Sequence, residues 1–113
     1  MSRWARRVDS NHAEVVGWFE DLHCSVINVS RTPCGFDLVV GYGGLSICVE
    51  VKDGKKSPSR RKLSDTEKKV HDRWTGGARI VKDMQDVITT VQTLQLWART
   101  LQQHLSQQRK EAA

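Results

Sequence analysis

Between residues 35 and 54 the chain alternates apolar and polar side chains on either side of a glycine-rich segment. The runs 36–40 and 45–51 are rich in β-branched and apolar residues, and Gly-Tyr-Gly-Gly separates them. Such a pattern predicts two β-strands joined by a tight turn. Because successive side chains of a strand point to opposite faces, one face of the second strand is apolar. The other face carries Ser46, Cys48, Glu50 and Lys52.

The predicted hairpin brings two carboxylates together. A turn of two or four residues centred on residues 42–43 places Asp37 opposite Cys48. Glu50 is then the diagonal neighbour of Asp37 on the same face, with Cβ atoms roughly 7 Å apart. Two carboxylates at that separation can bind one hard cation, which prefers oxygen ligands. Lys52 lies one step further along this face. A three-residue turn would break this parity and remove the site.

Helical spacing predicts the elements before the hairpin. A helix capped by residue 9 or 10 is expected over residues 10–22, because apolar residues recur at Val15, Trp18, Phe19 and Leu22. Asn11 and His12 either cap this helix or touch a substrate. A first strand is expected over residues 25–30.

A second helix begins with a recognisable signal. Ser64-Asp65-Thr66-Glu67 has the pattern of a capping box, in which the Glu67 carboxylate reaches back to the backbone of Ser64. This helix runs through Trp74 and ends at Gly76-Gly77. Capping explains Glu67 better than catalysis does. A further strand over residues 78–81 then completes the sheet beside the hairpin.

The last helix has a different pattern. After a cap at Asp83, apolar residues recur at steps of three and four through Met84, Val87, Val91, Leu94, Ala98, Leu101 and Leu105. This stripe resembles a heptad seam. The helix either folds back on its own core or pairs with a second copy. We expect pairing, with a core domain over residues 1–92 and an oligomerisation segment over residues 93–113.

Composition narrows the class of protein. The chain of 113 residues carries a net charge of +5, which suits a polyanionic partner such as DNA. No apolar run approaches the ~20 residues of a membrane span, and the N-terminus lacks the apolar core of a signal peptide. Three cysteines without metal-ligand spacing predict neither a disulfide framework nor a zinc site, so a reducing cytoplasm is expected.

The segment after the hairpin, residues 52–62, contains Gly, Pro and Ser but no apolar residue. It is predicted to be a surface loop. Although most charged loops are simply solvated, these cations follow directly after a candidate phosphate-cleaving centre. We therefore expect contacts with the DNA backbone from Lys55, Lys56, Arg60, Arg61 and Lys62.

These motifs carry a family resemblance. Asp37, followed after twelve residues by Glu50-Val51-Lys52, resembles the active-site hairpin of the PD-(D/E)XK nuclease superfamily. The run Glu50 to Gly54 with the basic loop after it is most similar to small phage nucleases of the VRR-NUC and Holliday-junction-resolvase-like branch. The resemblance covers residues 11–87. Phe36 replaces the structural proline of that pattern.

The resemblance implies a small mixed β-sheet flanked by helices, a restriction-endonuclease-like α/β core, and the expected order α-β-β-β-α-β-α matches it. The long C-terminal helix beyond about residue 91 is an extension of that core. It implies that Asp37, Glu50 and the Val51 carbonyl bind Mg²⁺ or Mn²⁺. Glu14 would be an outer acidic ligand, although a carboxylate near a helix N-terminus is also favourable by itself. Lys52 would position the attacking water or stabilise the phosphate.

The expected function is therefore a divalent-metal-dependent DNA endonuclease of phage or bacterial cytoplasm. The resemblance also places phosphate contacts at Ser30 and Arg31, where a solvated arginine is an equal alternative. A two-fold dimer would favour branched DNA, as in Holliday junction resolution. The alternatives are cleavage of flaps, nicks or plain duplex, a non-catalytic DNA-binding or adaptor protein, and a coiled-coil interaction module.

Overall fold

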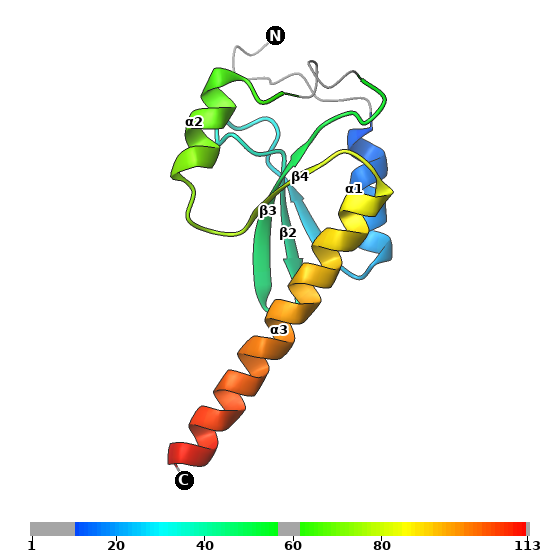
Figure 1. Cartoon of the computed structure of the whole chain (residues 1–113). Helices are drawn as coiled ribbons and strands as arrows, with labels where there is room; N and C mark the ends of the chain where they lie inside the picture. The colour runs from blue at the N-terminus through cyan, green and yellow to red at the C-terminus, as the bar shows by residue number, and fades with distance from the viewer. Residues whose placement is uncertain (1–10, 57–61, 113) are drawn as a thin grey trace.

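The computed structural model describes residues 11–56 and 62–112, which form a four-stranded sheet with helices on both faces (Figure 1). In chain order the elements are α1 (His12–Asp21), β1 (Ser25–Asn28), β2 (Leu38–Tyr42), β3 (Leu45–Val51), α2 (Asp65–Arg73), β4 (Ala78–Val81) and α3 (Met84–Ala112). The α/β class and the expected element order are confirmed. The strands before the turn are displaced from prediction: β1 stops at Asn28, and β2 begins at Leu38 rather than Phe36.

The sheet has the strand order β1-β2-β3-β4. The first two pairings are antiparallel and the third, between β3 and β4, is parallel. Parallel neighbours need a crossover connection, and here the loop after β3 together with α2 provides it. The ends of β3 and β4 consequently lie side by side, where the Lys52 N–H donates to the Val81 carbonyl at 2.9 Å.

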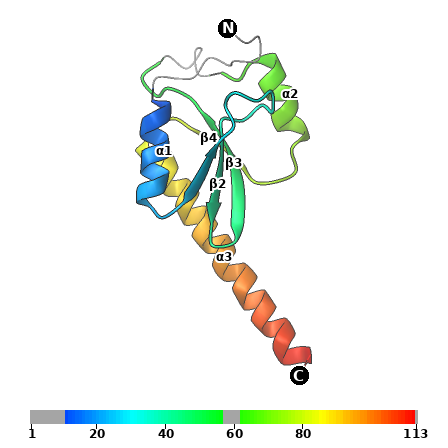
Figure 2. The same cartoon turned by 180° about the vertical axis from the view of Figure 1, so that it is seen from behind.

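The hydrophobic core lies on one face of the sheet. Strand residues such as Leu38 and Val49 are fully buried there, together with Phe19 of α1 and Leu94 of α3. Burying each of these large side chains stabilises the fold by about 1.5–3 kcal/mol. Figures 1 and 2 show α1 and α3 on one side of the sheet and α2 on the other.

The first helix is tied to the end of the sheet. Its N-cap is Asn11, whose side chain makes no capping hydrogen bond. Instead the Asn11 amide donates to the carbonyl oxygens of Lys52 at 3.0 Å and Lys82 at 3.3 Å, which bridges the ends of β3 and β4. The expected caps, residues 9 and 10, lie outside the described residues. His12 is buried within the first turn.

The second helix is held by aromatic packing over the loop that precedes β2. The ring of Phe36 stacks on His71 with centroids 4.3 Å apart and meets Trp74 edge-on. His71 Nε2 lies 3.0 Å from the Gly35 carbonyl oxygen. A Cβ atom on Gly35 would lie 2.7 Å from Val70 Cβ, so only glycine permits this approach. These contacts give His71 a structural role in the packing of α2.

The long helix α3 begins at the predicted cap, where Asp83 Oδ1 accepts from the Asp86 N–H at 2.9 Å. From Val87 to Ala98 its apolar stripe is buried on the protein's own core, past the boundary expected at residue 92. Beyond Ala98 the helix projects away from the sheet (Figure 1). Leu101 and Leu105 continue the stripe but are 41% and 43% exposed. Among the described residues no helix has the length and apolarity to cross a membrane.

Candidate functional site

The register of the hairpin decides where its acidic residues lie. A two-residue turn, Gly43-Gly44, joins β2 to β3, and Val39 pairs with Cys48. Both glycines have positive φ, 56° and 86°, which tight hairpin turns with the sheet's twist require. The turn is therefore one residue further along than expected, and the predicted pairing of Asp37 with Cys48 is wrong. The predicted even parity is confirmed.

Asp37 is fixed beside the last residues of β3. Its backbone N–H donates to the Val49 carbonyl at 2.9 Å, and its carboxylate Oδ2 accepts from the Val51 N–H at 2.8 Å. A carboxylate that accepts a backbone N–H in a buried setting makes a strong, charge-assisted hydrogen bond. Asp37 is 5% exposed and Glu50, between the two residues it contacts, is 2% exposed. The structure thus brings Asp37, Glu50 and Val51 together.

Lys52 joins this group from the end of β3. Its Nζ atom lies 3.7 Å from Glu50 Oε1 and 3.2 Å from Glu67 Oε1. Only 13% of the Lys52 side chain is exposed. An ammonium group so far from solvent needs acidic partners, because desolvating an unpaired charge is costly.

Glu67 is the residue that the sequence did not reveal as part of this site. The predicted capping box is present, since Ser64 Oγ accepts from the Glu67 N–H and Glu67 Oε1 accepts from the Ser64 N–H. The same carboxylate also contacts Lys52. Capping fully explained the glutamate in the sequence, and no local pattern relates residue 67 to the hairpin. Only the packing of α2 brings them together.

The environment of Glu67 keeps it ionised. Burial raises the pKa of this carboxyl group, but hydrogen bonds with the Glu50 side chain and the Ser64 backbone, and the charge of Lys52, outweigh burial and lower the pKa to about 2. The Lys52 ammonium therefore faces the carboxyl groups of both Glu50 and Glu67.

The carboxylate oxygens of Asp37 and Glu50 are ligands that a hard cation prefers, but two carboxylates supply few ligands. No group of three or more His, Cys, Asp or Glu side chains has metal-binding geometry within residues 11–56 and 62–112. Magnesium commonly keeps several waters and is bound through one or two carboxylates together with substrate phosphates. Asp37 and Glu50 meet that smaller requirement.

Glu14 does not join Asp37 and Glu50 in such a group. The reason is its helix: α1 buries Val15 against the hydrophobic core and leaves Glu14 exposed. Glu14 lines a cleft of about 280 Å³, whose other lining residues are Asn11, Trp18, Asp53, Gly54, Lys55, Lys82 and Asp83. The role of Glu14 as an outer ligand stays a prediction.

The predicted DNA contacts differ in their accessibility. Ser30 is 2% exposed, and its hydroxyl donates to Asn28 Oδ1 at 2.6 Å, so its position does not support a phosphate contact. Arg31, Lys55 and Lys62 are exposed, and Lys56 is half-buried. Arg60 and Arg61 lie outside the described residues.

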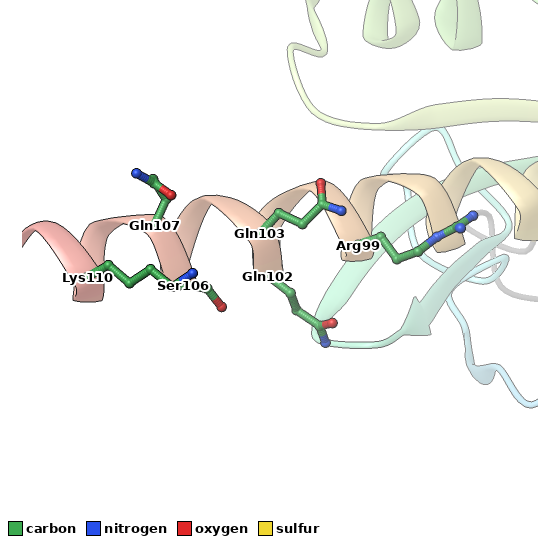
Figure 3. A pocket seen from close by; sticks show the side chains of 6 residues that line it. All are labelled: Arg99, Gln102, Gln103, Ser106, Gln107 and Lys110. Carbon is green, nitrogen blue, oxygen red and sulfur yellow. The ribbon is translucent and has the colours of Figure 1, made fainter.

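The projecting half of α3 has a polar side that carries none of the predicted site residues. A shallow hollow of about 500 Å³ there is lined by Arg99, Gln102, Gln103, Ser106, Gln107 and Lys110 (Figure 3). Helical spacing places these residues away from Leu101 and Leu105. The projecting helix is therefore amphipathic although nothing in the described chain covers its apolar side.

Comparison of the chain with models of protein families, with curated proteins and with solved structures gave no match.

Proposed function

We propose that this protein is a divalent-metal-dependent DNA endonuclease whose active site is built from Asp37, Glu50 and Lys52. The observation that carries the proposal is the burial of two carboxylates at the end of one hairpin, with an ammonium 3.7 Å from Glu50. Buried acidic residues are rare unless they are paired or bind metal, and they gather at functional sites.

Each residue of the site has a distinct role. Asp37 and Glu50 bind Mg²⁺ or Mn²⁺, with the Val51 carbonyl as a further ligand. A divalent ion held there supplies a bound water of lowered pKa and neutralises charge on the phosphate oxygens. Lys52 carries a fixed positive charge toward the phosphate and orients the attacking water.

The substrate that fits best is DNA. Its backbone is polyanionic, and the chain has a net charge of +5. Three exposed cations lie close to the site residues in sequence. Arg31 precedes Asp37, and Lys55 and Lys62 follow Lys52. Contacts of this kind bind phosphates without reading base sequence, and they weaken steeply with added salt.

We further propose that the projecting part of α3 pairs with a second copy of the chain. The side of the helix that is buried as far as Ala98 continues with Leu101 and Leu105 beyond the sheet, and Trp97 beside them is 39% exposed. A second copy offers the same apolar side in a symmetric contact. Two active sites related in this way suit branched DNA that is cut in both strands, as in Holliday junction resolution.

The competing function is DNA binding without catalysis. The observation that favours it is that Lys52 already engages Glu50 and Glu67 within the chain, while fewer than three acidic or histidine groups converge on one metal position in the described part. An adaptor of this kind would bind DNA equally well with or without divalent ions.

Cleavage of a labelled DNA panel tests the proposal. The panel contains a four-way junction, a flap, a nicked duplex, a plain duplex and a single strand, each with Mg²⁺, Mn²⁺ or a chelator. We expect metal-dependent cleavage that is lost in Glu50→Gln and Lys52→Met, with DNA affinity retained. Paired symmetric cuts in the junction support the resolvase, and cuts in other forms alone support a different nuclease. Binding without any cleavage by the folded, metal-loaded wild type would overturn the nuclease proposal.

A further inference from the structure

We propose that Glu67 is a positioning residue, which holds the Lys52 ammonium in place beside Glu50 in addition to capping α2. This inference rests on the proposed function, because it assigns Lys52 its place in that active site. It extends the site from the β-hairpin to α2, the helix that follows the charged loop in the chain.

One oxygen atom performs both tasks. Glu67 Oε1 accepts from the Ser64 N–H at 2.9 Å and from Lys52 Nζ at 3.2 Å. The first contact completes the cap of α2, and the second fixes the end of the lysine side chain. The position of the ammonium is thereby tied to the first turn of the helix.

Lys52 depends on this contact for its orientation. A lysine side chain has four rotatable carbon–carbon bonds and loses about 2 kcal/mol of rotamer entropy when it is fixed. Its distance of 3.7 Å to Glu50 is an ion pair but is too long for a hydrogen bond. The hydrogen bond to Glu67 is the one that the Lys52 ammonium makes within the described residues.

The helix that carries Glu67 is a firm support. Stacking of Phe36 on His71 and the contact of His71 with the Gly35 carbonyl hold the last turn of α2, independently of the cap at its start. Phe36 immediately precedes Asp37, so the same packing holds the loop that delivers the metal-binding carboxylate. Helix α2 therefore contacts both parts of the candidate site. It packs on Phe36 next to Asp37, and it hydrogen bonds to Lys52 through Glu67.

Two variants separate positioning from capping. Glu67→Gln keeps the cap, because glutamine also serves in capping boxes through its side-chain oxygen. It removes the negative charge that attracts Lys52. Ser64→Ala does the opposite, because it removes the hydroxyl from the cap and leaves the Glu67 carboxylate next to Lys52.

We expect Glu67→Gln to lower kcat for DNA cleavage at least tenfold, with KM changed less than threefold and divalent-metal affinity retained. Ser64→Ala should lower thermal stability and leave kcat within twofold of the wild type. Equal losses of kcat in the two variants would show that Glu67 acts through the fold, and wild-type kcat in Glu67→Gln would likewise overturn the inference.

A measurement independent of cleavage distinguishes failure of this inference from failure of the proposed function. In a double-mutant cycle on the unfolding equilibrium, Glu67→Gln and Lys52→Met should be coupled by at least fivefold. Ser64→Ala and Lys52→Met should be additive. If the wild type cleaves no DNA, the proposed function fails, and the cycle alone decides whether Glu67 positions Lys52. Additivity of Glu67→Gln with Lys52→Met would overturn it.

Discussion

Asp37 Oδ2 accepts a hydrogen bond of 2.8 Å from the backbone N–H of Val51, a residue fourteen positions later in the chain. The Asp37 side chain thus extends the hydrogen bonding between the two strands by one residue before β2 begins at Leu38. The carboxylate is held against β3 next to Glu50 before any ligand is bound. Such preorganisation reduces the free energy that binding must supply.

Replacing Asp37 separates its hydrogen bond to the Val51 N–H from its proposed role as a metal ligand. Asp37→Ala leaves the buried Val51 N–H without its acceptor and should reduce the free energy of unfolding by about 2 kcal/mol. Asp37→Asn keeps an acceptor oxygen and should cost less. With the proposed metal site, Mg²⁺ or Mn²⁺ should stabilise the wild type, and both variants should lose that stabilisation. Urea denaturation and thermal melting with and without metal measure these effects.

The matched control is Asp72→Asn, which alters an exposed carboxylate paired with Lys68 on α2. It should change stability by less than about 0.5 kcal/mol and retain the response to metal. Full metal stabilisation in Asp37→Asn would contradict the assignment of Asp37 as a ligand.

The acid stability of the protein should depend on Glu67. Its pKa is about 2 in the folded protein, below the ordinary 4.5. A carboxyl group with a lowered pKa contributes stability that is fully present above its unfolded value and is lost as the pH falls toward its folded value. Between pH 4.5 and 2 the wild type should lose up to about 3 kcal/mol through this group.

Urea denaturation across this pH window, in the presence of a chelator, measures the effect. Glu67→Gln has no carboxyl group to protonate at this position, so its stability should fall less steeply. Ser64→Ala retains the carboxyl group and the Ser64 backbone position, so it should follow the wild type. Parallel curves for Glu67→Gln and the wild type would argue against the lowered pKa.

Gly35 should be required for the packing of α2. In Gly35→Ala the new Cβ would lie 2.7 Å from Val70 Cβ, at a residue whose φ is +86°. We expect a loss of about 3 kcal/mol from backbone strain and crowding together. Gly44→Ala is a matched control, because Gly44 has the same φ of +86° and nothing within 4 Å of the added Cβ.

Gly44→Ala should therefore cost only the backbone strain, about 1–2 kcal/mol. Because α2 carries Glu67, Gly35→Ala should also reduce DNA cleavage more than Gly44→Ala does at equal folded fraction. Chemical denaturation and cleavage rates test both statements. Equal effects of the two substitutions would show that the contact with Val70 is unimportant.

The exposed stripe of α3 should determine the oligomeric state. Leu101→Glu together with Leu105→Glu places charges on the apolar side, so the proposed dimer should dissociate. The free energy of unfolding of the monomer should change by less than about 0.5 kcal/mol. Leu94→Ala, within the buried part, should instead cost about 2–5 kcal/mol. Analytical ultracentrifugation over a range of concentrations reports the association.

Gln102→Glu with Ser106→Glu on the polar side is the matched control, with the same added charge (Figure 3). It should leave the dimer intact. A wild type that is monomeric at every concentration, or dissociation by the control as well, would contradict pairing through Leu101 and Leu105.

Much of the fold was predictable because it depends on local patterns. Alternation and paired glycines identify a hairpin, the Ser64–Glu67 spacing identifies the start of α2, and strand 78–81 was located correctly. The even turn that gives Asp37 and Glu50 the same parity also follows from local chemistry. The one-residue displacement of the turn did not, since several glycines compete for the positive φ positions.

The composition of the site could be predicted only in part. Asp37, Glu50, Val51 and Lys52 come from one hairpin, so their proximity follows from strand geometry. The contact of Glu67 with Lys52 does not, because it depends on how α2 docks on the sheet. Docking is decided by distant contacts such as Phe36 with His71.

The sequence by itself therefore determined the order of elements, the parity of the hairpin and the cap of α2, all of which arise from interactions between near neighbours. Only the tertiary structure decided that α3 leaves its core at Ala98, and that the Glu67 carboxylate serves the lysine as well as the helix. The physical reason is the same in both cases. A side chain's partners across space depend on the summed packing of whole elements, which no short stretch of sequence encodes.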